Sequence, residues 1–169
     1  MNISGVVYMS NTGFTKRYAE MFADRHGLPL YSYDEAVNQL AKGSNIIYFS
    51  WLRAGSVYGY GKVSKKYSVK AVCGVCLGTT GSQTDGIRKA HSLNKDFPVF
   101  TLQGGMEISK LKGINRFMIK MLIKMLNSKD SKSEDEKAQL SLLENGGDYV
   151  SADNLTEVDN WYYCNADNK

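Results

Sequence analysis

The sequence predicts an α/β protein built as a three-layer sandwich, with a parallel sheet of five strands between two layers of helices. Short apolar runs of strand length alternate with segments of helical pattern over residues 1–102, which is typical of βαβ units. The run at 45–50 is apolar almost throughout, as expected of a central parallel strand covered on both faces. Turns rich in small and hydroxyl-bearing residues follow two of the strands, at 10–15 and 78–82.

Length and composition fit one domain over residues 1–169. Hydrophobic residues make up 43% of the chain and charged residues 22%, as in an ordinary globular protein, and no apolar run reaches the roughly 20 residues of a membrane span. The chain does not open on a basic segment followed by an apolar stretch, so we expect no signal peptide and a cytoplasmic protein. Its three cysteines fit reduced thiols better than a disulfide framework.

The first element is an apolar strand at 3–9, which leads through the turn at 10–15 into a helix beginning near Lys16. A helix N-terminus presents unpaired N–H groups and a partial positive charge, so a turn that feeds one can bind an anion. Ser10, Thr12 and Thr15 add hydroxyl donors. The turn is therefore a candidate phosphate site, although the same residue types also suit a plain strand-to-helix turn.

Two other phosphate loops are excluded by inspection. No G-x-G-x-x-G follows the first strand, which argues against a dinucleotide site. The nearest approach to a nucleoside triphosphate loop, at 59–62, lacks a glycine five residues before Gly61 and has Val63 where Ser or Thr should follow. The pattern S-x-T-G-x-T at 10–15 instead resembles the phosphate-binding loop of flavodoxins, which holds the single phosphate of FMN without a basic side chain.

The next elements continue the alternation. Gly27 is expected to end the first helix, a second strand is predicted at 28–31, and Asp34 is expected to cap a helix over 35–42. The third strand follows at 45–50. In the strand order 2-1-3-4-5 of flavodoxin-like sheets, ligands bind in the crevice between the first and third strands.

Two further loops belong to the same predicted edge. A long glycine- and aromatic-rich loop follows the third strand at 51–61, and the loop at 78–82 lies between the fourth strand (71–77) and a helix at 85–93. A fifth strand is predicted at 97–102. Together with the first turn, these loops would enclose a planar ring anchored by its phosphate, although each loop taken alone is better explained as a structural turn.

Cys73 and Cys76 form a C-x-x-C, but they sit within a short apolar run that is expected to be a buried strand. Residues three apart on a strand point to opposite faces, and the chain has no second cysteine pair to complete a metal site. His26 and His91 fall in helical segments without nearby ligand partners in the sequence. We therefore expect no metal.

An insertion at about 104–136 is predicted after the fifth strand. Its main element is an amphipathic helix at 114–126, and between Lys110 and Lys132 seven basic residues accompany a single acid, Asp130. The helix is either a core element with a solvated basic stripe or a surface that lies on a membrane or a hydrophobic partner. A charged linker at 127–136, a helical turn at 138–143 and a last helix at 154–163 complete the prediction.

Three stretches together resemble the flavodoxin-domain family that includes menaquinone-dependent protoporphyrinogen oxidase of bacteria. They are S-x-T-G-x-T at 10–15, Leu52-Arg53-Ala54-Gly55, which is similar to the family's Ile-Arg-x-Gly, and the segment at 115–125. The last begins Asn115-Arg116-Phe117-Met118-Ile119-Lys120 and resembles the family's Asp-Arg-Phe-Met-Ile-Lys. The likeness covers most of residues 1–126.

The resemblance implies an FMN-binding oxidoreductase with a quinone as its candidate acceptor, whose insertion helix contacts a membrane at its inner face or a quinone. It assigns the FMN phosphate to Ser10, Asn11, Thr12, Gly13, Phe14 and Thr15. It assigns the border of the ring to Ser50, Trp51, Leu52, Arg53, Ala54 and Gly55 on one side, and to Gly78, Thr79, Thr80, Gly81 and Ser82 on the other.

Net charge favours two-electron chemistry over low-potential electron carriage. The chain carries +4, and a cation such as Arg53 beside the ring would stabilise the negatively charged reduced flavin. None of the three loops offers an evident general acid or base, so the catalytic residues stay unassigned. Two alternatives remain open: an electron-transfer flavodoxin that serves protein redox partners, and a binding module without flavin. Nucleic acid is not expected, because the basic residues cluster on an apolar helix.

Overall fold

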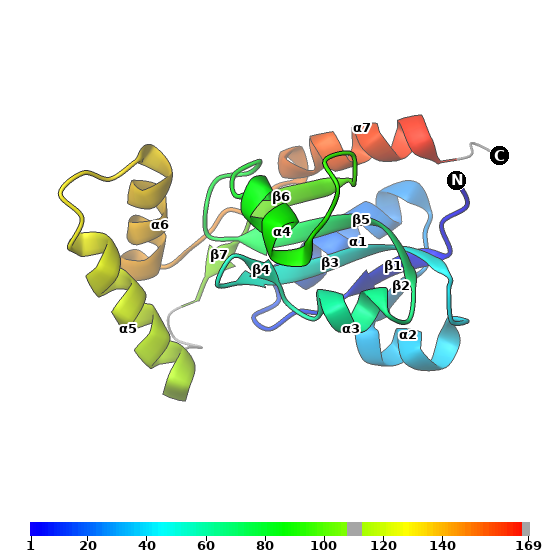
Figure 1. Cartoon of the computed structure of the whole chain (residues 1–169), viewed down its shortest axis with the longest axis horizontal. Helices are drawn as coiled ribbons and strands as arrows, with labels where there is room; N and C mark the ends of the chain where they lie inside the picture. The colour runs from blue at the N-terminus through cyan, green and yellow to red at the C-terminus, as the bar shows by residue number, and fades with distance from the viewer. Residues whose placement is uncertain (108–112, 167–169) are drawn as a thin grey trace.

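The computed structural model describes residues 1–107 and 113–166. Within them, five parallel strands form one sheet in the order β2-β1-β3-β5-β6, flanked by helices (Figure 1). The strands are β1 (Gly5–Tyr8), β2 (Leu30–Ser32), β3 (Asn45–Arg53), β5 (Ser68–Cys76) and β6 (Val99–Gln103). This architecture confirms the predicted α/β sandwich and its flavodoxin-like strand order, with β3 at the centre of the sheet and two parallel strands on each side of it.

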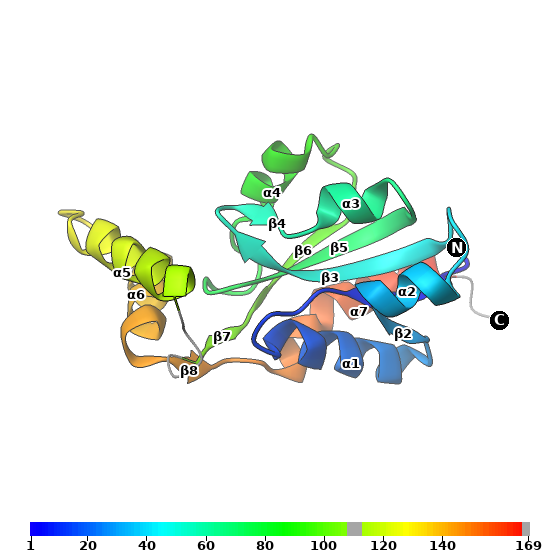
Figure 2. The same ribbon diagram turned by 90° about the horizontal axis from the view of Figure 1, so that it is seen from below.

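Helices cover both faces of the sheet (Figure 2). One layer consists of α1 (Phe14–His26) and α7 (Thr156–Asn165), and the other of α2 (Tyr33–Gln39), α3 (Tyr60–Ser64) and α4 (Thr84–His91). Alternate residues of β3 serve the two layers: Ile47 and Phe49 pack towards α1, while Ile46 and Tyr48 pack towards α2 and α3. The continuous apolar run at 45–50 therefore reflects burial on both faces.

The second helix begins earlier than predicted. Its cap is Ser32 rather than Asp34, because the Ser32 hydroxyl accepts a hydrogen bond from the Glu35 amide while the Glu35 carboxylate accepts one from the Ser32 amide. The helix then ends at Gln39 instead of continuing to Lys42. At the first helix, Gly27 adopts the left-handed conformation and ends α1, as predicted.

The long loop predicted at 51–61 is largely ordered structure. The third strand continues to Arg53 and turns back through Ala54 and Gly55 into β4 (Ser56–Val57), which pairs with β3 in antiparallel fashion. Both turn residues have positive φ, 48° and 75°, the backbone that a two-residue hairpin turn requires. Because Ala54, and not glycine or asparagine, occupies the first of these positions, the hairpin could not be predicted from the sequence.

The insertion forms a helical hairpin that projects beyond the carboxyl edge of the sheet (Figure 1). Its helices are α5 (Gly113–Asn127) and α6 (Glu134–Asn145), and a short antiparallel ribbon of β7 (Gly105–Met106) and β8 (Gly147–Asp148) joins them to the sandwich. The predicted linker at 127–136 is wrong over its last three residues, because a capping box between Ser133 and Glu136 starts α6 at Glu134. Residues 108–112 lie outside the described residues.

The last segment returns to the sandwich as a 3-10 turn, η2 (Ala152–Leu155), followed by α7. Leu155 and Val158 are fully buried against the sheet, as the predicted helix at 154–163 required. None of the helices in the described part of the chain combines the length and the apolar character that crossing a membrane demands.

Candidate functional site

The turn at 10–15 places the N-terminus of α1 at the carboxyl edge of the sheet. The Ser10 hydroxyl oxygen accepts hydrogen bonds from the amides of Gly13, at 3.2 Å, and Lys16, at 3.4 Å. Gly13 occupies the cap position with φ of 98°, so no side chain caps the helix there. Among the described residues the amides of Phe14 and Thr15 have no hydrogen-bond partner. Two donors at the positive end of a 13-residue helix are thus free to bind an anion.

A cleft of 620 Å³ opens beside this turn, across the carboxyl ends of β2, β1 and β3. This volume falls within the roughly 300–1,000 Å³ of small-molecule sites. Its lining residues come from five segments of the chain: Tyr8, Met9, Ser10, Asn11, Gly13, Lys16, Ser32, Tyr33, Asp34, Trp51, Tyr58 and Lys62.

An aromatic pair forms one wall of the cleft. The rings of Trp51 and Tyr58 stack at 4.6 Å with an interplanar angle of 20°. They meet because the β3–β4 hairpin brings the two residues together, and the Tyr58 amide donates to the Trp51 carbonyl at 3.0 Å. Beneath them, the buried Tyr48 hydroxyl donates to the Tyr58 carbonyl at 2.6 Å, and burial raises the pKa of Tyr48 well above its usual range. Two hydrogen bonds to the backbone of Tyr58 therefore hold the aromatic pair in place.

His91 holds the other strand of this hairpin. Its Nε2 atom accepts a hydrogen bond from the Val57 amide at 2.9 Å and lies 3.0 Å from the Ser56 hydroxyl, while its ring packs 4.7 Å from Tyr60. An amide can only donate, so Nε2 is unprotonated and the imidazole is neutral. Burial lowers the pKa of His91 from its usual value. The hairpin contact therefore depends on the neutral form of the ring.

Acidification is expected to weaken this contact. Because the pKa of His91 is lowered by folding, its stabilising contribution is complete above about pH 6.5 and is lost as the pH falls towards the folded-state pKa. The His91→Gln variant keeps an acceptor for Val57 but does not titrate. Urea unfolding at pH 7.5 and pH 5.5 should show a smaller acid-induced loss of stability in the variant than in the wild type. Equal losses would mean that His91 does not titrate against the hairpin.

The cations of the cleft are Lys16 and Lys62 rather than Arg53. The Lys62 ammonium lies 4.4 Å from the centre of the Tyr33 ring, and the Lys16 ammonium lies 3.5 Å from Glu20. Arg53 is exposed at the hairpin turn and does not line the cleft. Burial raises the pKa of Tyr8, and Lys16 partly opposes that rise. Positive charge in the cleft thus comes from α1 and α3.

A second cavity, of 440 Å³, lies on the other side of the same turn. It is lined by residues of the turn and of the β7–β8 ribbon, which runs beside the N-terminal end of α1 (Figure 2). Arg17 forms an ion pair with Asp148 across it. A Cβ on Gly105 would lie 2.5 Å from the Phe14 ring, so Phe14 packs directly on the ribbon backbone. The base of the insertion therefore contacts the turn at 10–15.

The predicted site residues do not form one site: some line the larger cleft, some line the second cavity, and others are buried or exposed away from both. Ser10, Asn11, Gly13 and Trp51 line the larger cleft, and Thr12, Gly13 and Phe14 line the second cavity. Thr15 and Ser50 are buried, Leu52 packs over Gly74, and Arg53, Ala54 and Gly55 are exposed at the hairpin turn.

The loop at 78–82 lines neither cavity. It is tied to β6 instead, because the Gly81 amide donates to the Thr101 carbonyl at 3.0 Å and the Thr80 hydroxyl accepts from the Gln103 amide at 3.0 Å. Gly78, Thr79 and Ser82 belong to the same folded-back turn, in which the Ser82 hydroxyl donates to the Thr79 carbonyl. These hydroxyls are engaged within the fold.

Sequence reasoning missed the contribution of β2 to the cleft. Ser32, Tyr33 and Asp34 lie at the end of the strand that neighbours β1, so the predicted strand order already placed them at this edge. Within residues 1–107 and 113–166 there is no group of three metal-ligating side chains. Cys73 and Cys76 are both buried, and burial raises the pKa of the Cys73 thiol well above its usual range.

Comparison of the chain with protein-family models, curated protein sequences and solved structures gives no match. The functional inference rests on the residues of the larger cleft.

Proposed function

We propose that this protein binds FMN in the larger cleft and acts as an FMN-dependent oxidoreductase. The observation that carries the proposal is that one cleft is lined both by the turn at the start of α1, through Ser10, Asn11, Gly13 and Lys16, and by a stacked aromatic pair. The unpaired amides of Phe14 and Thr15 directly follow Gly13. A ligand that has both a terminal phosphate and a flat ring system matches this combination. FMN has both, with a flexible ribityl chain between them.

The turn suits a phosphate monoester. The amides of Phe14 and Thr15, next to Gly13 at the edge of the larger cleft, would donate to the phosphate oxygens, and Lys16, which lines that cleft, would add positive charge. Gly13 leaves the approach open, since a Cβ built on it would meet no atom within 4 Å. A phosphate can therefore approach the start of α1 at Gly13 without meeting a side chain.

The aromatic wall suits the ring. Tyr58 is 42% exposed, so the Trp51–Tyr58 pair offers solvent-accessible aromatic surface within the cleft. Covering that surface with a planar ring removes apolar area from water and adds a stacking contact. Tyr8, Met9 and Tyr33 line the space between the pair and the turn. They provide the mixed apolar and hydroxyl lining that positions a linker and a ring edge.

Bound flavin would supply the redox chemistry, exchanging two electrons with a reduced substrate and an acceptor. The chain's own residues bind and orient it, and Lys16 and Lys62 favour negative charge in the cleft. The net charge of +4 acts in the same direction. The resemblance to the protoporphyrinogen oxidase branch makes a quinone the acceptor to test first and a porphyrinogen the first substrate.

The alternative function is electron carriage between protein partners. The basic α5 helix favours it, because Lys120 and Lys124 are exposed and would attract an acidic redox protein. The two functions predict different redox behaviour. An oxidoreductase of this charge should take up two electrons at one potential, whereas a carrier should take them up in two separate steps.

The test begins with the absorbance spectrum of the full chain after incubation with FMN and removal of free ligand by gel filtration. Retained flavin bands are expected, followed by a single two-electron wave on potentiometric titration. Reduction by protoporphyrinogen with transfer to a menaquinone analogue would establish the substrate class. A protein that retains no flavin would refute the proposal, and two resolved one-electron steps would favour the carrier.

A further inference from the structure

Positive charge is concentrated in one segment of the chain. From Lys42 to Lys95 the sequence carries nine basic residues and a single acid, Asp85, whereas the rest of the chain carries twelve basic residues and sixteen acids. The segment forms β3, β4, α3, β5 and α4. The net charge of +4 therefore combines a strongly basic segment with a remainder that is acidic.

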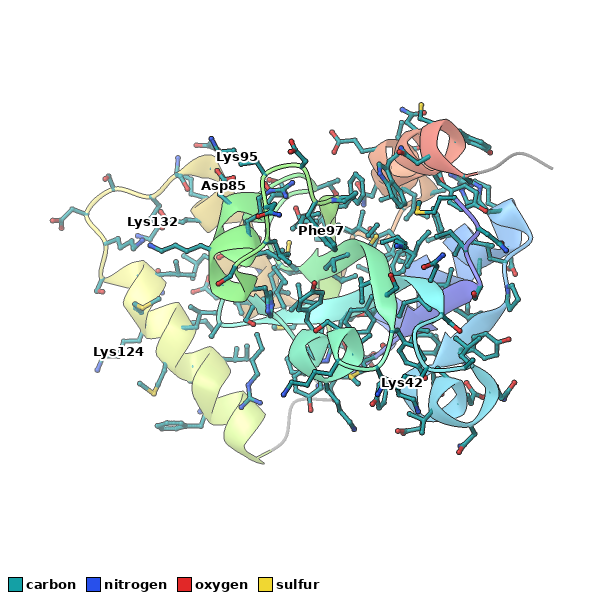
Figure 3. The ribbon with its side chains drawn as sticks, turned by 45° about the vertical axis from the view of Figure 1, so that its right-hand side comes forward. Lys42, Asp85, Lys95, Phe97, Lys124 and Lys132 are labelled. Carbon is teal, nitrogen blue, oxygen red and sulfur yellow. The ribbon has the colours of Figure 1, made fainter. Side chains whose placement is uncertain are left out.

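Folding places this charge on one side of the sandwich. Helices α3 and α4 cover the same face of the sheet (Figures 1 and 2), and the Tyr60 and His91 rings pack 4.7 Å apart where the two helices meet. Figure 3 shows Lys42 near α3 and Lys95 near α4, so the charge extends across both helices. Six basic residues of the segment are exposed and are here called the basic face: Lys42, Arg53, Lys62, Lys65, Lys89 and Lys95.

The cations of the segment have no acidic partner within the protein. Among the described residues, none of the nine forms an ion pair, and the ion pairs lie instead on α1, α7, β8 and the α5–α6 hairpin. Lys66 and Arg88 donate to backbone carbonyls, which leaves their positive charge uncompensated. The opposite layer, formed by α1, η2 and α7, has three basic residues against five acids. Like charges on one face repel one another, so an acidic partner would relieve this repulsion.

Three features of the basic face indicate which kind of anion it fits. Among the described residues, none of the large exposed hydrophobic side chains lies on α3 or α4, so these helices present no apolar anchor for a lipid bilayer. Five of the six exposed cations are lysines, which hold carboxylates as hydrated point charges and lack the fork with which arginine binds phosphates. A nucleic acid is charged along its whole length, and the acidic remainder of the chain would repel it beyond the face. A short acidic stretch of polypeptide fits all three features.

We propose that the basic face docks an acidic peptide segment of a partner protein. Carboxylates of the segment pair with Lys62 and Lys65 on α3 and with Lys89 on α4. An extended segment of about ten residues reaches about 33 Å, the width of a small domain, and so crosses both helices. Exposed ion pairs are individually weak and are screened by salt, so the complex is transient and sensitive to ionic strength. Docking is independent of flavin binding and needs no ligand in the larger cleft.

The experiment measures binding of the full chain, without FMN, to a fluorescein-labelled peptide of about ten residues that consists mostly of glutamate, followed by fluorescence anisotropy. Binding should weaken at least about 10-fold between about 20 mM and about 300 mM salt. The double variant Lys65→Glu, Lys89→Glu should bind the peptide about 10-fold or more weakly than the wild type at low salt. Neither lysine lines the larger cleft, so the flavin site is left intact.

The matched control is Lys120→Glu, Lys124→Glu, which changes the net charge equally through two exposed lysines of α5 and should alter peptide binding by no more than about 2-fold. Circular dichroism would establish that each variant is folded, and amide shifts in NMR spectra should change on α3 and α4 when the peptide is added. No binding at low salt, or an equal loss in the two variants, would overturn the proposal. Tighter binding of a single-stranded DNA oligonucleotide of the same charge would also overturn it, because the face would then be a nucleic-acid site.

Discussion

Replacing Gly13 by alanine is expected to weaken FMN binding by about 10-fold or more. Gly13 caps α1 with φ of 98° and ψ of −23°, a conformation that costs an L-residue on the order of 1–2 kcal/mol. Space is not the obstacle, because a Cβ there would meet nothing within 4 Å. The backbone is expected to relax towards negative φ, which turns the adjacent amides of Phe14 and Thr15 away from the phosphate. Quenching of flavin fluorescence during titration measures the loss.

Gly81→Ala is the matched control for this effect. Gly81 also has positive φ, 85°, and a Cβ on it would also meet nothing within 4 Å, but it lies in the loop at 78–82, which lines neither cavity. Both variants should lose about 1–2 kcal/mol of stability, whereas only the Gly13 variant should lose FMN affinity. Equal loss of affinity in the two variants would make the loop at 78–82 a part of the FMN site as well, as the sequence predicted.

The second large effect is expected at the junction of α1 and α7. Replacing Asp159 by alanine should lower the free energy of unfolding by about 3–5 kcal/mol. The Asp159 side chain is 8% exposed, pairs with Arg25, and lies with Oδ1 2.7 Å from Nε2 of His26, which is itself 1% exposed. Removing the carboxylate leaves a buried imidazole donor without its acceptor, among the rings of Phe22 and Tyr162. Urea unfolding would measure the change.

The exposed ion pair between Arg17 and Asp148 provides the comparison. Its side chains are 47% and 49% exposed, so solvent screens their attraction, and Asp148→Ala should cost less than about 1 kcal/mol. A loss of the same size in both aspartate variants would show that burial does not control the strength of the Asp159 contacts.

The sequence pattern was sufficient to predict the strands of the sheet, because each strand is marked by residues that lie next to one another in the chain. Each parallel strand is a short apolar run bounded by turn residues, whereas the strand order 2-1-3-4-5 came from the likeness to flavodoxin-like sheets. Errors arose where a boundary depended on side-chain geometry. Ser32 and Ser133 each cap a helix through a reciprocal bond to a glutamate three residues later, and both start their helix before the predicted residue.

The cleft was only partly predictable. Ser10, Asn11 and Gly13 were found because a strand, a hydroxyl-rich turn and a helix lie next to one another in sequence. Tyr58 and Lys62 depend on the hairpin at Ala54, where an alanine with positive φ gives no sequence signal of a turn. The loop at 78–82 resembles a ligand loop in composition, yet its hydroxyls are bonded within the turn and to β6. Composition alone does not distinguish free donors from engaged ones.

Calorimetric titration of the full chain with FMN and with riboflavin tests the central claim most directly. The two ligands share the ring and differ in the phosphate, so their difference in affinity measures the phosphate contacts, which are the amides at the start of α1 together with Lys16. We expect FMN to bind at least about 100-fold more tightly than riboflavin, as two charge-assisted hydrogen bonds would provide. Equal affinities, or no binding of FMN, would contradict a phosphate site at 10–15.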